Sequence, residues 1–326
     1  MDTFRFGIMG AGRIAEKFCD AVRRIDGAEV AAVASKSAER AQTFAARNGI
    51  ASWHADYGEM LARGDIDAVY IATTHNFHYE NILECLEYGK PVLCEKCMVL
   101  TKRQAEEVFA CAREKKLFVM EAMWSRFLPT IRKARQWIEE GRIGGVTMAN
   151  ACLGWVAPQD VGNRMYNPDL AGGALYDMGV YCIEIMSCLI GGDIRKVRSD
   201  IVFAETGVDK SDCITLEFDD CLASLQVSIA AQIEECAYLY GTRGYIRIPA
   251  FHKGQGCFLY GPDGSLVEKF DDPTENGFVY EAEEVVRCVN AGRLESGVMP
   301  AEDTIRCAEI FDLCLAKDAA AGTRGV

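Results

Sequence analysis

The stretch Gly7-Ile8-Met9-Gly10-Ala11-Gly12-Arg13-Ile14-Ala15 decides the fold of the first part of this chain. It lies between an apolar run and a segment with the apolar spacing of a helix. Its core, Gly10-x-Gly12-x-x-Ala15, is the pattern of a dinucleotide-binding turn. Gly10 permits the tight turn, Gly12 lets the backbone approach a pyrophosphate at the helix N-terminus, and Ala15 allows close helix–strand packing. A glycine-rich turn without a ligand is the alternative, but the strand–turn–helix context favours the nucleotide.

The residues around this motif alternate between short apolar runs and helical segments. Because the runs are apolar on both faces, they predict a doubly wound parallel sheet covered by helices on both sides. We therefore expect a Rossmann domain over residues 1–122. The expected strands are 4–9, 28–35, 68–73, 91–96 and 118–123, and the expected helices are Ile14–Arg24, Ala38–Asn48, Phe77–Tyr88 and Lys102–Lys115.

From Met123 onward the pattern changes to successive strands joined by short turns. This indicates an α+β domain over residues 123–326 with a large, mostly antiparallel open sheet, which would hold the substrate and join subunits. Apolar residues alternate along strands that few helices would cover, so we expect a homodimer or higher homo-oligomer. The expected strands are Val146–Leu153, Val197–Phe203, Cys213–Phe218, Leu222–Ile229, Cys236–Tyr240 and Tyr245–Ile248, and the expected helices are Thr130–Glu140, Tyr280–Asn290 and Ala301–Lys317.

The charge and composition of the chain exclude several classes of partner. The 326 residues carry a formal net charge of -13, which argues against nucleic acid and against an anionic membrane surface. We see neither a signal peptide nor an apolar run of the roughly 18 residues that a membrane span needs. The fifteen cysteines are scattered through expected helices and strands, which is typical of reduced thiols in a cytoplasmic protein.

The end of the second expected strand indicates which nucleotide binds. It reads Ala34-Ser35-Lys36-Ser37, with Arg40 one turn later. An NAD enzyme usually offers an acidic residue here to the ribose 2′-hydroxyl, whereas hydroxyls and cations suit a 2′-phosphate. We therefore expect NADP rather than NAD, the alternative being a solvated turn with an exposed lysine.

Two further segments carry residues suited to oxidising an alcohol. Glu95-Lys96 ends a buried strand, where open α/β sheets place their ligands. Asp177 and Tyr181 follow a glycine-rich start and would share one face if that stretch is helical. A tyrosine is a poor base at its ordinary pKa near 10, but a neighbouring lysine cation lowers that pKa. Lys96 and Tyr181 are therefore a sensible catalytic pair.

Over essentially its whole length, the sequence resembles the glucose–fructose oxidoreductase/inositol dehydrogenase/rhizopine-catabolism family. The matching pieces are Gly10–Ala15, Thr73–His78, Glu95-Lys96 and Gly172–Tyr181. The resemblance implies hydride transfer between a nicotinamide and a carbon of a cyclic polyol, such as the monosaccharide D-xylose or a trans-dihydrodiol. Glu121–Phe127 is most similar to the branch of the family that acts on such substrates.

The resemblance also implies roles for individual residues. Lys96 and Tyr181 would be catalytic, with Asp177 supporting them, and Trp124 and Arg126 would lie near the substrate. The expected cofactor contacts are Gly10, Gly12, Arg13, Ile14, Ser35, Lys36, Arg40, Thr73, Asn76, His78 and Glu95, of which Asn76 and His78 would lie near the nicotinamide. Many relatives have a histidine where this chain has Tyr181. The family usually has Glu-Lys-Pro, with a proline that is often cis, where this chain has Cys97.

Other interpretations of these residues are weaker. His75-x-x-His78 and Cys94-x-x-Cys97 together have the residue types of a zinc site, but the resemblance already accounts for those positions. A redox Cys-x-x-Cys would open a helix in a thioredoxin-like fold. A cofactor-binding regulator without turnover is the serious rival, because one fold hosts unrelated functions. The presence of Lys96, Asp177 and Tyr181 together favours an enzyme.

Overall fold

The computed structural model describes residues 3–321, which form two compact units. The first comprises the residues up to Trp124 together with Asn276–Ile305, and the second comprises Ser125–Glu275 with the residues from Arg306 onward. The sequence-based boundary at 122/123 assigned residues 276–305 to the second domain, whereas their contacts lie with the first. The side chain of Asn276 donates to the carbonyl of Lys17 at 3.0 Å and to Asp20 at 2.8 Å, which ties the returning segment to the first unit.

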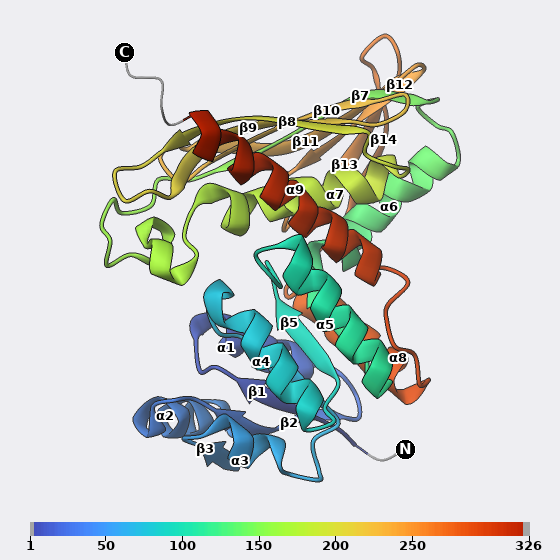
Figure 1. Cartoon of the computed structure of the whole chain (residues 1–326). Coiled ribbons are helices and arrows are strands. Elements are labelled where there is room, and N and C mark those ends of the chain that lie inside the picture. The colour runs from blue at the N-terminus through green and yellow to red at the C-terminus, as the bar shows by residue number, and fades with distance from the viewer. Residues whose placement is uncertain (1–2, 322–326) are drawn as a thin grey trace. The chain divides into compact units, whose positions relative to one another are not determined.

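The first unit contains a six-stranded parallel sheet in the order β3-β2-β1-β4-β5-β6. This order confirms the expected Rossmann architecture. α4 packs against α5 and α1 against α8, and the two pairs lie on opposite faces of the sheet (Figure 1). The strands are β1 (Phe4–Met9), β2 (Ala28–Ala34), β3 (Ser52–His54), β4 (Ala68–Ile71), β5 (Val92–Glu95) and β6 (Val119–Ala122), and the helices are α1 (Arg13–Val22), α2 (Ala38–Asn48), α3 (Tyr57–Leu61), α4 (His75–Glu87), α5 (Lys102–Lys115) and α8 (Phe278–Asn290).

The second unit contains an eight-stranded sheet in the order β14-β13-β12-β11-β7-β10-β9-β8. Its pairs are antiparallel except β7 with β10, so the expected mostly antiparallel sheet is confirmed. Helices α6, α7 and α9 lie along one face of this sheet (Figure 1). The strands are β7 (Val146–Gly154), β8 (Lys196–Phe203), β9 (Asp209–Glu217), β10 (Leu222–Ser228), β11 (Ile233–Gly241), β12 (Gly244–Pro249), β13 (Gly256–Tyr260) and β14 (Leu266–Asp271), and the helices are α6 (Pro129–Glu139), α7 (Val180–Ile190) and α9 (Ala301–Ala321).

Four elements were not expected from the sequence: β3, α3, β13 and β14. They are three to six residues long, too short for a period of two or of 3.6 to stand out. Each is stabilised by pairing or packing with a neighbour rather than by its own pattern. β14, for example, pairs with β13 although most of its side chains are exposed.

The helical stretch at the centre of the second unit is long and apolar. Pro168–Ile190 has the length and a mean hydropathy of 1.4 that a membrane span also has. However, 78% of its most apolar window is buried inside the protein, and α7 packs against β7 and β10. The hydropathy of this stretch is therefore that of a core helix.

Candidate active site

The glycine-rich turn connects β1 to α1 and leaves the start of α1 open. Gly10 has φ +103°, and a Cβ there would come within 2.9 Å of the Ala72 backbone, so only glycine fits. Gly12 is the N-cap residue of α1. Because glycine has no side chain, no N-cap side chain accepts a hydrogen bond from the first backbone N–H groups of the helix. Arg13 is exposed, Ile14 is half-buried, and Ala15 is fully buried. This arrangement fits a pyrophosphate on the helix N-terminus.

The end of β2 presents a cation beside two aromatic rings. Lys36 is exposed, and its Nζ lies 5.3 Å from the ring centre of Phe77 and 5.9 Å from that of Tyr57. Ser35 is buried, while the Ser37 hydroxyl accepts from the backbone N–H of Arg40 and caps α2. The three side chains at the strand end thus include one available cation and no carboxylate, as a 2′-phosphate requires.

The first turn of α4 is connected to the end of β5 through His78. Its Nδ1 lies 2.9 Å from the carbonyl oxygen of Cys97, and its Nε2 lies 3.0 Å from that of Thr73. The ring is fully buried, and burial lowers the pKa of His78. Both ring nitrogens therefore face backbone carbonyls, which favours a supporting role for His78. Asn76 accepts from the Thr74 hydroxyl at 2.7 Å, and its expected contact with a nicotinamide stays a prediction.

Lys96 follows β5, and the Lys96–Cys97 peptide bond is cis. The preceding Glu95 is buried, accepts from the Tyr70 hydroxyl, and also accepts from the Lys96 backbone N–H at 3.3 Å. Burial raises the pKa of Glu95 to about 7. Glu95 is thus held inside the first unit by Tyr70, and the nearby Lys96 charge favours its ionised form.

A second buried acid in the same unit, Glu281, lacks hydrogen-bond donors like those of Glu95. Glu281 of α8 is fully buried, and neither of its carboxyl oxygens has a hydrogen-bond partner among the described residues. Burial, followed by the charge of Glu95, raises the pKa of Glu281 well above its usual range. Both effects favour the protonated form of the Glu281 carboxyl.

Asp177 and Tyr181 were expected to share one face only if their stretch of chain is helical, and the structure shows that it is. Leu175–Gly179 forms a π-helical turn, and α7 continues from Val180. Such turns are frequent at functional sites. Asp177 is buried and accepts from Arg164 Nη2 at 3.0 Å. The sequence did not identify this partner, which neutralises the carboxylate inside the second unit.

Asp209, which the sequence analysis missed, holds the start of this helical stretch. Its Oδ2 accepts from the backbone N–H of Leu175 at 2.6 Å. Gly173, in the glycine-rich motif, has φ +117°, and a Cβ there would collide with Asp209 Oδ1. Burial raises the pKa of Asp209 to about 6. The motif glycine is therefore explained by an acid that lies far along the chain.

Tyr181 is mostly buried, and its ring lies 5.1 Å from the ring of His252. Lys96 belongs to the first unit and Tyr181 to the second, so their pairing stays a prediction.

The two expected substrate contacts lie in different surroundings. The Trp124 ring stacks on Phe278 at 5.0 Å within the first unit. Arg126 and Glu184 form an ion pair of 2.9 Å in the second unit, with side chains only 3% and 1% exposed. This buried pairing favours a structural role for Arg126, whose contact with substrate stays a prediction.

Neither a metal site among the described side chains nor a reactive thiol at Cys94 is indicated. Among residues 3–316, whose side chains the structure describes, no three His, Cys, Asp or Glu side chains are placed to hold a metal ion. Cys94 is fully buried, and burial raises the pKa of its thiol well above the usual range, so it is not nucleophilic.

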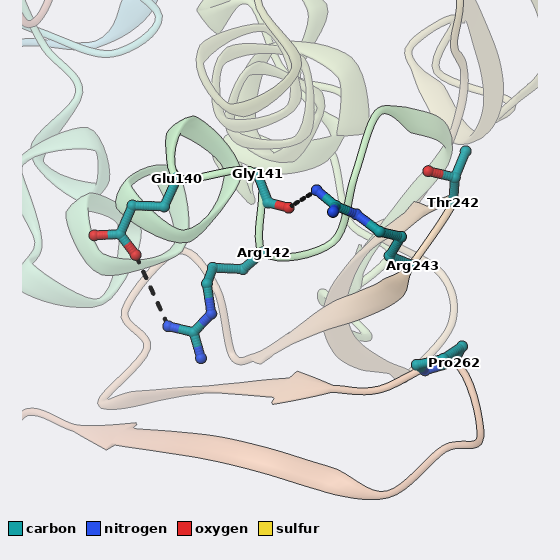
Figure 2. A pocket seen from close by; sticks show the side chains of 6 residues that line it. All are labelled: Glu140, Gly141, Arg142, Thr242, Arg243 and Pro262. Atoms are coloured by element: carbon teal, nitrogen blue, oxygen red, sulfur yellow. Dashed lines mark hydrogen bonds and ion pairs between the residues drawn. The ribbon is translucent and has the colours of Figure 1, made fainter.

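An open cleft of about 620 Å³ in the second unit is lined by Glu140, Gly141, Arg142, Thr242, Arg243 and Pro262. Figure 2 shows its two arginines turned toward partners in the protein. Arg243 donates to the Gly141 carbonyl at 2.6 Å, and Arg142 pairs with Glu140 at 3.8 Å and with Glu268 at 3.0 Å. Because both guanidinium groups are engaged, the cleft is not a convincing anion site.

A Rossmann unit with an open glycine turn, followed by a unit with a large open sheet, defines a two-domain nucleotide-binding protein. Residues 4–123 match the model of the oxidoreductase family with an NAD-binding Rossmann fold, and residues 131–247 match the GFO/IDH/MocA C-terminal domain. This chain therefore belongs to the Gfo/Idh/MocA family, as its motifs indicated.

Two similar curated proteins and one solved structure support this assignment along nearly the whole chain. Trans-1,2-dihydrobenzene-1,2-diol dehydrogenase from Xenopus laevis is 34% identical, covering 95% of this chain and 97% of that protein. D-xylose 1-dehydrogenase (NADP(+)) from Hypocrea jecorina is 31% identical, covering 96% and 91%. The 3-ketoreductase KijD10 from Actinomadura kijaniata, in complex with NADP and TDP-benzene, is 26% identical with a TM-score of 0.84, covering 97% and 98%.

Proposed function

We propose that this protein is an NADP-dependent dehydrogenase that transfers a hydride between the nicotinamide and a hydroxyl or carbonyl carbon of a cyclic polyol. The substrate would be a monosaccharide such as D-xylose, or a trans-dihydrodiol, because similar proteins with these activities align along nearly the whole chain. The observation that carries the proposal is the uncapped start of α1, which follows a turn where only glycine fits.

The nicotinamide would supply the hydride acceptor or donor, and residues of this chain would do the rest. The α1 N-terminus would bind the pyrophosphate, and Lys36 would contact the 2′-phosphate. Tyr181 would take the hydroxyl proton during oxidation, and Lys96 would lower the pKa of Tyr181 by favouring its anion. Asp177 would support both. These catalytic roles rest on residue chemistry and on the family resemblance.

A non-catalytic regulator of the same fold is the competing function. It would bind the nucleotide but would not need an acid–base group near the substrate. The joint presence of Lys96, Asp177 and Tyr181 favours turnover, as do the dehydrogenase activities of the similar proteins.

We also propose a homodimer that forms through the face of the large sheet opposite α7. Residues in register across six neighbouring strands make an apolar row on that face. We call it the tyrosine row, and its members are Leu222, Met148, Tyr240, Tyr245, Tyr260 and Leu266. Met148 is 49% exposed and Leu266 is 55% exposed, which is unusual for apolar side chains packed side by side. A second copy would cover them by the symmetry of an isologous interface.

A cytoplasmic location is part of the same proposal. Most of the fifteen cysteines are buried as thiols rather than cross-linked, which suits a reducing compartment.

The test of the proposed function is a screen of sugars and cyclic diols with NADP, read as absorbance of the reduced nicotinamide. Turnover of D-xylose or of a trans-dihydrodiol is the expected result. Activity confined to linear 2-hydroxy acids or to aldehydes would contradict the substrate class. NADP binding without turnover of any polyol would instead support the regulator.

A further inference from the structure

The turn between β12 and β13 places His252 by several backbone contacts. The N–H of Ala250 donates to the Glu235 carbonyl at 2.9 Å, and the N–H of Lys253 donates to the Ala250 carbonyl at 2.9 Å. The Thr130 hydroxyl donates to the Gly254 carbonyl at 2.9 Å, and Phe251 is fully buried. Because both flanks of His252 are fixed, its imidazole has a defined position.

The carboxylate of Glu235 on β11 then fixes the orientation of that imidazole. A single oxygen, Oε1, lies 2.9 Å from the His252 backbone N–H and 2.5 Å from His252 Nδ1. The two side chains are only 12% and 16% exposed. A carboxylate accepts but does not donate, so Nδ1 must carry a hydrogen. In the neutral ring, Nε2 is therefore a hydrogen-bond acceptor.

The oriented imidazole lies against Tyr181. The two ring centres are 5.1 Å apart, with the planes inclined at 46°. This separation is within the range of favourable aromatic pairs. Ring packing alone does not require a mostly buried carboxylate, because burying that charge costs free energy unless donors satisfy it. The Glu235–His252 pair thus supplies orientation that a plain apolar contact would not.

We propose that Glu235 and His252 are positioning residues for Tyr181. Glu235 holds the imidazole in its Nδ1–H tautomer, and the imidazole holds the phenol ring in the orientation that proton transfer needs. The inference rests on the proposed role of Tyr181 as the proton-transfer residue. It adds to the active site two residues from β11 and the β12–β13 turn that carry no motif in the sequence.

The kinetic test compares His252→Phe and Glu235→Gln with the wild type. His252→Phe keeps a ring against Tyr181 but removes the donor to Glu235, and Glu235→Gln keeps an acceptor but removes the charge. Both should lower kcat about 10- to 100-fold, the scale of a misplaced catalytic group. KM should change less than about threefold, because substrate binding itself is not removed. NADPH affinity should be unaltered, whereas the thermal midpoint of His252→Phe should fall, because the mostly buried Glu235 carboxylate loses a donor.

Glu234→Gln is the matched control on the same strand. Glu234 is 83% exposed and pairs only at 3.5 Å with Arg247, so its variant should keep wild-type kcat. A His252→Phe protein with wild-type kcat would show that ring packing suffices and would overturn the inference.

A Tyr181→Phe background separates this inference from the proposed function. If His252 acts through Tyr181, adding His252→Phe there should cause no further loss of kcat. A further loss of about tenfold would overturn the inference but would leave the proposed function intact. Tyr181→Phe with wild-type activity would instead refute the proposed role of Tyr181.

Nitrogen-15 NMR of the imidazoles provides a readout that needs no turnover. The chain has only four histidines, so the His252 signal is assigned by its absence in His252→Phe. It should report the Nδ1–H tautomer in the wild type and lose that tautomer in Glu235→Leu, whose side chain has no acceptor. An unchanged tautomer in Glu235→Leu would overturn the inference even if no substrate is found.

Discussion

The backbone N–H of Leu175 donates a hydrogen bond of 2.6 Å to the carboxylate of Asp209, on a distant strand of the same unit. This bond places a negative charge at the start of the helical stretch that carries Asp177 and Tyr181, where the helix dipole favours it. The carboxylate also occupies the space beside Gly173 that a side chain would need. The position of the proposed catalytic tyrosine thus depends on an acid far away in the sequence.

The first prediction tests this dependence with Gly173→Ala. Gly191→Ala is the control, because Gly191 also has a positive φ but has nothing within 4 Å of a built Cβ. In both variants the new alanine must adopt a strained positive φ, but only Gly173→Ala also displaces Asp209. Its free energy of unfolding should therefore fall by about 1–3 kcal/mol more than that of the control, as measured by urea denaturation. If both variants lose the same free energy of unfolding, Asp209 can move aside without destabilising the protein, and the prediction is wrong.

The second prediction concerns the buried carboxyl of Glu281. Its pKa is raised by burial, so the folded state keeps a proton that the unfolded chain releases as the pH rises above about 4.3. The stability of the wild type should therefore decline with rising pH through this group. Glu281→Gln removes that decline, so its thermal midpoint relative to wild type should increase between pH 5 and pH 8.

Glu283→Gln, exposed on the same helix, is the control for this pH series. Its difference from wild type should be the same at both pH values. If the Glu281→Gln difference is also independent of pH, Glu281 is ionised in the folded protein and the prediction is wrong.

The third prediction concerns the choice of nucleotide. Lys36→Ala should weaken NADP(H) binding about 10- to 150-fold, because a charge-assisted contact contributes about 1.5–3 kcal/mol. NAD(H) affinity should stay the same, since NAD lacks the 2′-phosphate. Fluorescence titration with both nucleotides measures this, and Lys196→Ala in the second unit is the control. Equal wild-type affinities for NADP(H) and NAD(H) would contradict the proposed specificity.

The fourth prediction concerns proton transfer. Tyr181→Phe should lower kcat about 100-fold or more, the usual scale of general acid–base catalysis. NADPH affinity should hardly change, because Tyr181 does not belong to the unit that carries the glycine turn. Tyr176→Phe, in the preceding π-helical turn, keeps its ring contact with Phe311 and should retain wild-type activity. If Tyr181→Phe keeps more than about a tenth of the wild-type kcat, another residue must transfer the proton.

The fifth prediction concerns assembly through the tyrosine row. Tyr240→Glu places a charge at its centre, which should convert the dimer into a particle of 35.9 kDa in light scattering at micromolar concentration. Leu294→Glu alters an exposed apolar residue of the first unit and should remain dimeric. A wild type that is already monomeric under these conditions would reject the interface.

Much of the fold could be predicted because its signals are local. The turn at Gly10 requires a positive φ that glycine readily adopts, and apolar runs between helical segments predict a parallel sheet wherever they occur. The end of β2 carries Lys36 and no acidic residue, and this can be seen in the sequence without knowledge of any tertiary contact. These features depend on the conformational preferences of a few consecutive residues, and the family motifs are built from them.

The sequence by itself therefore determined the Rossmann unit, the open antiparallel sheet and the nucleotide turn. Tertiary structure alone decided that residues 276–305 join the first unit, that Asp209 anchors the helix start, and that Glu235 orients His252 against Tyr181. No local pattern marks these residues, because an acid or a histidine has the same backbone preferences whether it is buried or solvated. Their roles arise from burial and from partners brought together by strand pairing, which exist only once the chain has folded.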